Sequence, residues 1–272
     1  MNWYLQSGKN ADVVLSSRVR VSRNLQKYPF GTKCSEKQFH EILEEIEEIT
    51  PSLGYGLKFI HLKDVDDITK ISLVEKHMIS PDFVMEHNHE KAMLVNDEEN
   101  ICIMINHEDH IELQAFSSGE DLENLMHLMV EIDEKLGDLV TYSYSKQFGF
   151  LTVSMADVGT AMKASVMVHL PALTLTGNIS KVLHIVNNFG MSIRGLYGEG
   201  TQSQGDIYQI SNYQTLGLTE EEIVRNIKTI VDKVIEQERL ARKYLAKNPL
   251  ELEDRVYRSY GILTNARMLS SE

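Results

Sequence analysis

Three short strand-like segments joined by two polar connections place the strongest constraint on how this chain can fold. The segments are 92–95, 101–105 and 111–116, and the connections are residues 96–100 and 106–110. Connections of this length join neighbouring antiparallel strands, as in hairpins. The spacing therefore predicts an antiparallel sheet. Period-two patterning predicts further strands at 13–21, 57–62, 163–170 and 207–211.

Helical periodicity marks the segments that would pack on this sheet. Residues 35–49 and 121–136 gather their apolar side chains on one side, and Ser35 is a suitable N-cap. Residues 219–245 begin with Thr219 and Glu222, spaced as in a capping box. Further helices are expected at 66–78, 179–189 and 250–261. Helices mixed with hairpins favour an α+β fold, a mainly antiparallel sheet flanked by helices.

Composition limits the classes of function. A chain of 272 residues can bury a large core, and without a Gly/Ser/Pro linker we expect one domain over residues 1–272. The net charge of -13 argues against nucleic acid and anionic membranes as main partners. Cys34 and Cys102 suggest neither a disulfide framework nor a zinc site. No leader or membrane-spanning stretch is recognisable, which predicts a cytoplasmic protein.

Two acidic loops carry the chemistry that the sequence suggests. Asn-His-Glu-Asp-His occupies 106–110, and Arg-Gly-Leu-Tyr-Gly-Glu-Gly occupies 194–200. Near the start, Arg18 and Arg20 alternate along an expected strand, so their side chains point to one face. Carboxylates can hold a guanidinium and accept its proton, while arginines bind phosphate groups. The combination predicts phosphoryl transfer to a basic nitrogen.

The chain resembles the guanidino (phosphagen) kinase family, and within it the bacterial protein arginine kinases. The resemblance runs from about Asp12 to Met268, and five segments carry it in order: 14–24, 74–81, 158–171, 194–200 and 252–261. It implies a guanidino-kinase catalytic-domain fold, without the C-terminal domain of the bacterial enzymes. It also implies transfer of the γ-phosphoryl group of Mg-ATP to arginine side chains of proteins, and it leaves open an activator protein and a homodimer.

The resemblance assigns roles to individual residues. Glu108 and Glu199 fall on the catalytic carboxylates, which align the guanidinium and help remove its proton. Asp109 would support magnesium through water, with no direct metal ligand. The ATP phosphates would be held by Arg18, Arg20, Lys163 and Arg194. The glycine-rich segment 195–205 is expected to form a mobile lid.

Five positions depart from the family pattern. His107 stands where the family has a glutamate, Glu112 replaces a basic residue, and Lys163 replaces an arginine; Ser154 replaces a reactive-site cysteine and Asp157 an asparagine. A carboxylate at position 112 would either face the phosphates or turn to Lys163 or Arg18 and neutralise part of the phosphate clamp, and both arrangements predict impaired transfer. The alternative is therefore a catalytically silent pseudokinase that acts as a regulatory or binding protein.

The histidines near the acidic loop suggest a rival metal site. His107 and His110 flank Glu108 and Asp109, and a His-Asn-His run occupies 87–89. A zinc hydrolase would usually present His-Glu-x-x-His on a helix, and this spacing and context differ from that pattern. Packed histidines are the simpler interpretation.

Overall fold

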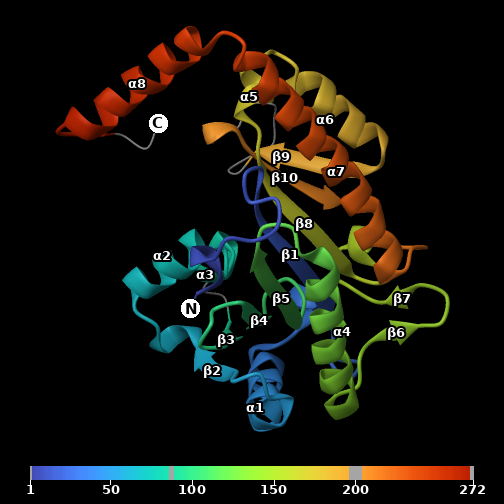
Figure 1. The fold of residues 1–272 in the computed structure, drawn as a ribbon. Coiled ribbons are helices and arrows are strands. Elements are labelled where there is room, and N and C mark those ends of the chain that lie inside the picture. Colours follow the sequence, from blue (N-terminus) through green and yellow to red (C-terminus); the bar gives the residue numbers. More distant parts are fainter. Residues whose placement is uncertain (1, 86–88, 196–203, 270–272) are drawn as a thin grey trace.

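The computed structural model describes residues 2–85, 89–195 and 204–269. Within these ranges an eight-stranded sheet forms the centre, in the order β2-β3-β4-β5-β1-β8-β10-β9 (Figure 1). Each pair of neighbouring strands is antiparallel. The strands are β1 Val14–Arg23, β2 Lys58–His61, β3 Ala92–Val95, β4 Ile101–Ile105, β5 Ile111–Ser118, β8 Met162–His169, β9 Met191–Gly195 and β10 Ile207–Asn212. A separate hairpin pairs β6 Tyr144–Ser145 with β7 Gly149–Phe150.

The helices agree closely with the periodicity of the sequence. They are α1 Glu36–Leu53, α2 Asp67–Glu75, α3 Pro81–Met85, α4 Leu122–Leu139, α5 Pro171–Leu175, α6 Ile179–Asn188, α7 Glu220–Leu245 and α8 Pro249–Asn265. Capping boxes at Ser35 and Thr219 open α1 and α7. The predicted α+β class, mainly antiparallel and flanked by helices, is confirmed. The sequence analysis did not predict α3, α5 or β9.

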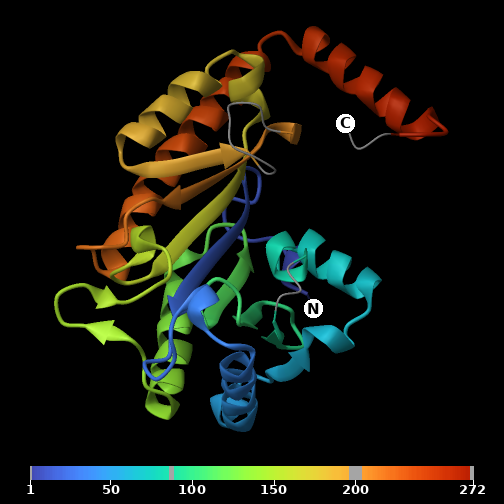
Figure 2. The ribbon, with the colours of Figure 1, turned by 180° about the vertical axis from the view of Figure 1, so that it is seen from behind.

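One face of the sheet carries the larger apolar core. Helices α4, α6 and α7 lie on this side, as the two opposite views show (Figures 1 and 2). Strand side chains that point to it are apolar and buried, including Val19, Leu113, Val166 and Ile210. The apolar side chains of each alternating strand therefore pack against these helices.

The opposite face is divided into an apolar half and a polar half. Over β3, β4 and β5 a second apolar cluster includes Phe83, Met104 and Phe116, and Trp3 stacks on Phe116 with ring centroids 5.5 Å apart. Over β1, β8 and β10 most side chains on the same face are polar or cationic, among them Arg18 and those described below. The functional groups therefore lie where no helix of the larger core covers the sheet.

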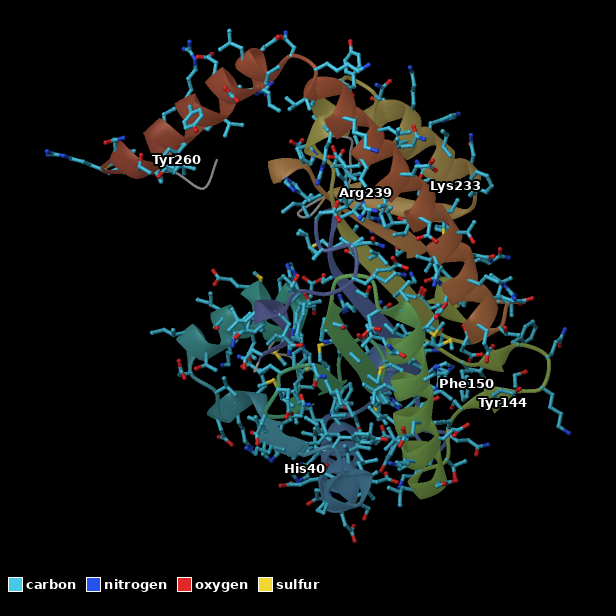
Figure 3. All side chains as sticks on the ribbon, viewed as in Figure 1. His40, Tyr144, Phe150, Lys233, Arg239 and Tyr260 are labelled. Carbon is cyan, nitrogen blue, oxygen red and sulfur yellow. The ribbon has the colours of Figure 1, made fainter. Side chains whose placement is uncertain are left out.

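The C-terminal helices differ in how they are held. The Glu238 side chain of α7 is fully buried, and its carboxylate accepts the backbone N–H groups of Ala172 at 3.1 Å and Leu173 at 3.0 Å, which caps α5. By contrast, α8 contains no buried residue and extends away from the sheet (Figure 1). Tyr260 on this helix is labelled in Figure 3. Among the described helices none is long and apolar enough to cross a membrane.

Candidate active site

A pocket of about 270 Å³ on the polar half of the sheet brings together the basic residues that the sequence analysis assigned to ATP. Arg18 and Arg20 come from β1, Lys163 from β8 and Arg194 from β9. Strand register explains the grouping, because Arg20 lies opposite Lys163 on the neighbouring strand. We call this the cation pocket; its remaining lining residues are Ser165, Ser192, Gln209, Ser211, Asn212 and Tyr213.

Arg18 is held in place and desolvated before any ligand arrives. Its Nη2 donates to Gln114 Oε1 at 2.5 Å, and its guanidinium lies 5.5 Å from the centre of the Phe116 ring. Its Nε is buried and has no hydrogen-bond partner within the described ranges. Burial and the neighbouring charge of Arg20 lower the pKa of Arg18 to about 10. A cation destabilised in this way favours an anion beside it, so the donor set fits a polyphosphate.

The acidic loop 106–110 connects β4 to β5 and borders a second pocket. Asn106 adopts a φ of 60° and donates its side-chain amide to Phe39 O at 2.9 Å and Glu90 O at 3.1 Å, which fixes the turn. The exposed Glu108 side chain forms no hydrogen bond to another described residue and lines a pocket of about 750 Å³. We call it the acceptor pocket; it is also lined by Phe30, Gly31, Lys33, Cys34, Glu36, Phe39, Asp82, His89, His107, Thr152 and Val153.

Asp109 anchors the acidic loop rather than pointing into open space. It is buried, and its Oδ1 accepts from Asn24 Nδ2 at 2.5 Å and from the Val153 backbone N–H at 2.8 Å. Burial raises the pKa of Asp109 although both hydrogen bonds oppose that shift. The residue therefore joins the loop to Asn24, which directly follows β1, and to the wall of the acceptor pocket. A role toward ATP-bound magnesium stays a prediction.

The histidines around this loop are packed and hydrogen bonded. His110 Nδ1 accepts the Leu25 backbone N–H at 3.1 Å, while its Nε2 donates to Pro29 O at 3.1 Å. Burial lowers the pKa of His110 to about 4. His89 stacks on Phe39 with centroids 3.9 Å apart. Across the part of the chain that the structure describes, no three His, Cys, Asp or Glu side chains are placed to hold a metal ion; His87 lies outside it.

Four of the five departures from the family pattern contact one another in two pairs. Glu112 Oε1 lies 2.8 Å from His107 Nδ1, and Asp157 Oδ1 lies 2.9 Å from Lys163 Nζ. Glu112 is buried on β5, and its Oε2 lies 3.4 Å from Arg20 Nη1. It does not line the cation pocket. Of the two expected arrangements it takes the one in which it neutralises a cation, but its partner is Arg20 instead of Lys163 or Arg18.

The remaining predicted positions have varied outcomes. Ser154 is the N-cap residue of the short 3-10 turn Met155–Asp157, and its backbone oxygen accepts from Thr152 Oγ1 at 2.7 Å. Glu199 and most of the predicted lid, residues 196–203, lie outside the described residues.

The arginine at the end of β1 belongs to the core instead of the site. Arg23 Nη2 lies 2.5 Å from Asp133 Oδ2, and its guanidinium stacks 3.4 Å from the centre of the Phe150 ring. Phe150 is labelled on the β6–β7 hairpin in Figure 3.

The sequence analysis missed the uncharged polar lining of the cation pocket. Ser165, Gln209 and Ser211 project from β8 and β10 on the same face as the cations. Their signal was available, since polar residues alternate with apolar ones through 163–166 and 208–211. Asn212 also holds the strands together, because its side-chain amide donates to Met162 O at 3.0 Å and its oxygen accepts from Ala164 N at 2.8 Å.

Comparison with known proteins identifies the relatives of this chain. The family model for the C-terminal catalytic domain of ATP:guanido phosphotransferases matches residues 36–241. A protein-arginine kinase from Halothermothrix orenii is 42% identical over 273 residues, which cover 100% of this chain and 78% of the relative. A protein-arginine kinase from Bacillus licheniformis is also 42% identical, over 277 residues, which cover 100% and 76%.

Solved structures show the same fold at lower identity. The duplicated taurocyamine kinase of Schistosoma mansoni, with bound transition state analog components, has a TM-score of 0.77 at 24% identity, covering 90% of this chain and 36% of that one. Lombricine kinase has a TM-score of 0.74 at 22% identity, covering 86% and 68%. With the cation pocket, the acidic loop and the matched residues together, this chain belongs to the ATP:guanido phosphotransferase family.

Proposed function

We propose that this protein transfers the γ-phosphoryl group of Mg-ATP to arginine side chains of other proteins. The observation that carries the proposal is the cation pocket, with Arg18, Arg20, Lys163 and Arg194 on one face of the sheet, together with the carboxylate of Glu108 in the acceptor pocket. Relatives at about 40% identity that are named protein-arginine kinases favour arginine in proteins as the acceptor.

Each group would act through ordinary electrostatics. The guanidinium groups of Arg18 and Arg20 would bind phosphate oxygens through forked hydrogen bonds, and Lys163 would add a point charge. Magnesium bound to ATP would neutralise further phosphate charge. Glu108 would align the acceptor guanidinium, and we assign Glu199 to the same task from the other loop. As the new N–P bond forms, the P–O bond to ADP breaks, and a carboxylate receives the proton that leaves the nitrogen.

The space around Glu108 suits a polypeptide acceptor. Another pocket, of about 670 Å³, adjoins the acceptor pocket and shares Glu36 and His89 with it. Each volume alone is in the range that holds a drug-sized ligand, so the pair could also take residues on either side of an arginine. Because Cys34 and Cys102 are both free thiols, we place the reaction in the reducing cytoplasm.

Phosphate transfer from labelled ATP tests this proposal. The protein would be incubated with an arginine-rich protein or with free arginine, and label in an acid-labile, alkali-stable bond would be counted. We expect label on the protein acceptor, and a loss of about 100-fold or more in Glu108→Gln. Equal labelling of free arginine would contradict the assignment of a protein acceptor. Tight Mg-ATP binding without any transfer would instead favour the regulatory pseudokinase.

A further inference from the structure

A buried carboxylate lies between the two pockets. Glu112 contacts Arg20 through Oε2 at 3.4 Å and His107 through Oε1 at 2.8 Å. Arg20 lines the cation pocket, whereas His107 lines the acceptor pocket and directly precedes Glu108. A single carboxylate thus joins a phosphate-binding side chain to the loop that carries the guanidinium-binding side chain.

The other ring nitrogen of His107, Nε2, is also held by a neighbouring side chain. Its Nε2 lies 3.1 Å from Ser80 Oγ, which also accepts the Phe83 backbone N–H at 3.1 Å. The Phe83 ring meets the imidazole edge-on, at 5.5 Å and 88°. With a proton on Nδ1 the imidazole donates to Glu112, and Nε2 and the Ser80 hydroxyl are hydrogen bonded to each other, so both ring nitrogens have partners. The ring has little freedom to turn.

Charge balance explains why Glu112 can be buried at this position. Burial by itself raises the pKa of Glu112, but the hydrogen bond from His107 and the charge of Arg20 outweigh that effect and lower it. The carboxylate is therefore ionised at neutral pH and needs both partners. An ionised buried carboxylate that loses a partner is strongly unfavourable, so the three side chains hold one another in a single arrangement.

We propose that Glu112 and His107 are positioning residues that fix Arg20 and the Glu108 loop relative to each other. This role rests on the proposed function, because it matters only if a phosphoryl group passes between the two pockets. In-line transfer depends on the distance between donor and acceptor, and a displacement near 1 Å can lower the rate about 100-fold. Loss of the bridge should therefore reduce kcat while each substrate still binds.

A double-mutant cycle on kcat tests the bridge. Glu112→Gln and His107→Leu should each lower kcat about 100-fold, with KM for ATP changed less than about threefold. If the residues act as one unit, the double variant should be no slower than either single variant. His107→Gln should keep kcat within about fivefold, because its amide can donate to Glu112 and accept from Ser80.

Two controls separate positioning from folding and from phosphate binding. Calorimetric titration with a non-hydrolysable ATP analogue should give one site per chain in every variant, whereas a merely structural role would lower this stoichiometry. Lys163→Gln removes charge from the cation pocket at a residue paired with Asp157, so it should raise KM for ATP more than it lowers kcat.

Several outcomes would overturn the inference. Losses that multiply to about ten thousandfold in the double variant would show that Glu112 and His107 act independently. Variants that change KM for ATP alone would show that Glu112 serves only the cation pocket. If the unchanged protein labels no arginine at all, the proposed function itself fails, and the positioning role fails with it.

Discussion

Replacing Arg18 by methionine should change stability and nucleotide binding in opposite directions. The pKa of Arg18 is lowered from 12.5 to about 10, so its charged form carries a folding penalty of about 3 kcal/mol at 1.36 kcal/mol per unit. The penalty applies in full at every pH below the folded pKa, because Arg18 is then protonated both folded and unfolded. The substitution also removes the Gln114 hydrogen bond and the Phe116 contact, which costs about 2 kcal/mol of folding stability and offsets most of the relieved penalty. Arg18→Met should therefore raise the free energy of unfolding by about 1 kcal/mol, which corresponds to roughly 2–4 °C in Tm.

The same substitution should weaken Mg-ATP. Losing charge-assisted hydrogen bonds to phosphate costs about 1.5–3 kcal/mol, which is roughly a 10- to 150-fold weaker affinity. Thermal unfolding without ligand and calorimetry with Mg-ATP measure the two effects separately. Arg23→Met on the same strand is the matched control, because it leaves Asp133 unpaired and should cost about 3–5 kcal/mol. A lower Tm in Arg18→Met with unchanged ATP affinity would refute the reasoning.

Three further predictions concern other groups. Glu108→Gln should lower kcat about 100-fold or more while the Kd for Mg-ATP stays within about twofold, because this carboxylate lies in the acceptor pocket; equal loss of ATP binding would contradict that location. Asp157→Asn should release Lys163 and tighten Mg-ATP binding about threefold at low salt, and calorimetry that finds no change would place the pair away from the phosphates. His110 has its pKa lowered from 6.5 to about 4, so its contribution is complete above pH 6.5 and about 3 kcal/mol is lost as the pH falls toward 4. His110→Gln should make urea unfolding less dependent on pH over this window, and an unchanged dependence would exclude His110 as its source.

The sheet and the long helices could be predicted because their signals are local. Short connections fixed the order of β3, β4 and β5, while an N-cap at Ser35 and a capping box at Thr219 marked the first turns of α1 and α7. The elements that were missed are short. Helix α5 has only five residues and begins where buried Glu238, 66 positions from Ala172, supplies its cap. A contact between residues so far apart leaves no periodic pattern in the short segment itself.

The candidate site was predicted in part for the same reason. Strand alternation was sufficient to place Arg18 and Arg20 on one face, and a strand at 163–170 brought Lys163 beside them. The partner of Glu112 could not be read from alternation, because several cations share that face and only side-chain packing selects Arg20 and His107. The sequence alone therefore left open whether Glu112 repels phosphate or neutralises a cation, and it did not predict the pairing with Arg20.

Helix α8 has a consequence for how the molecule responds to heat and proteases. Its 17 residues include none that are buried, so its stability comes mainly from its own backbone hydrogen bonds and local pairs such as Arg258 with Asp254, 2.8 Å apart. Helices of about this length are only marginally stable in water without tertiary packing. The amides of α8 should therefore exchange with solvent far faster than those of β1, and a protease should cut α8 while the sheet stays intact.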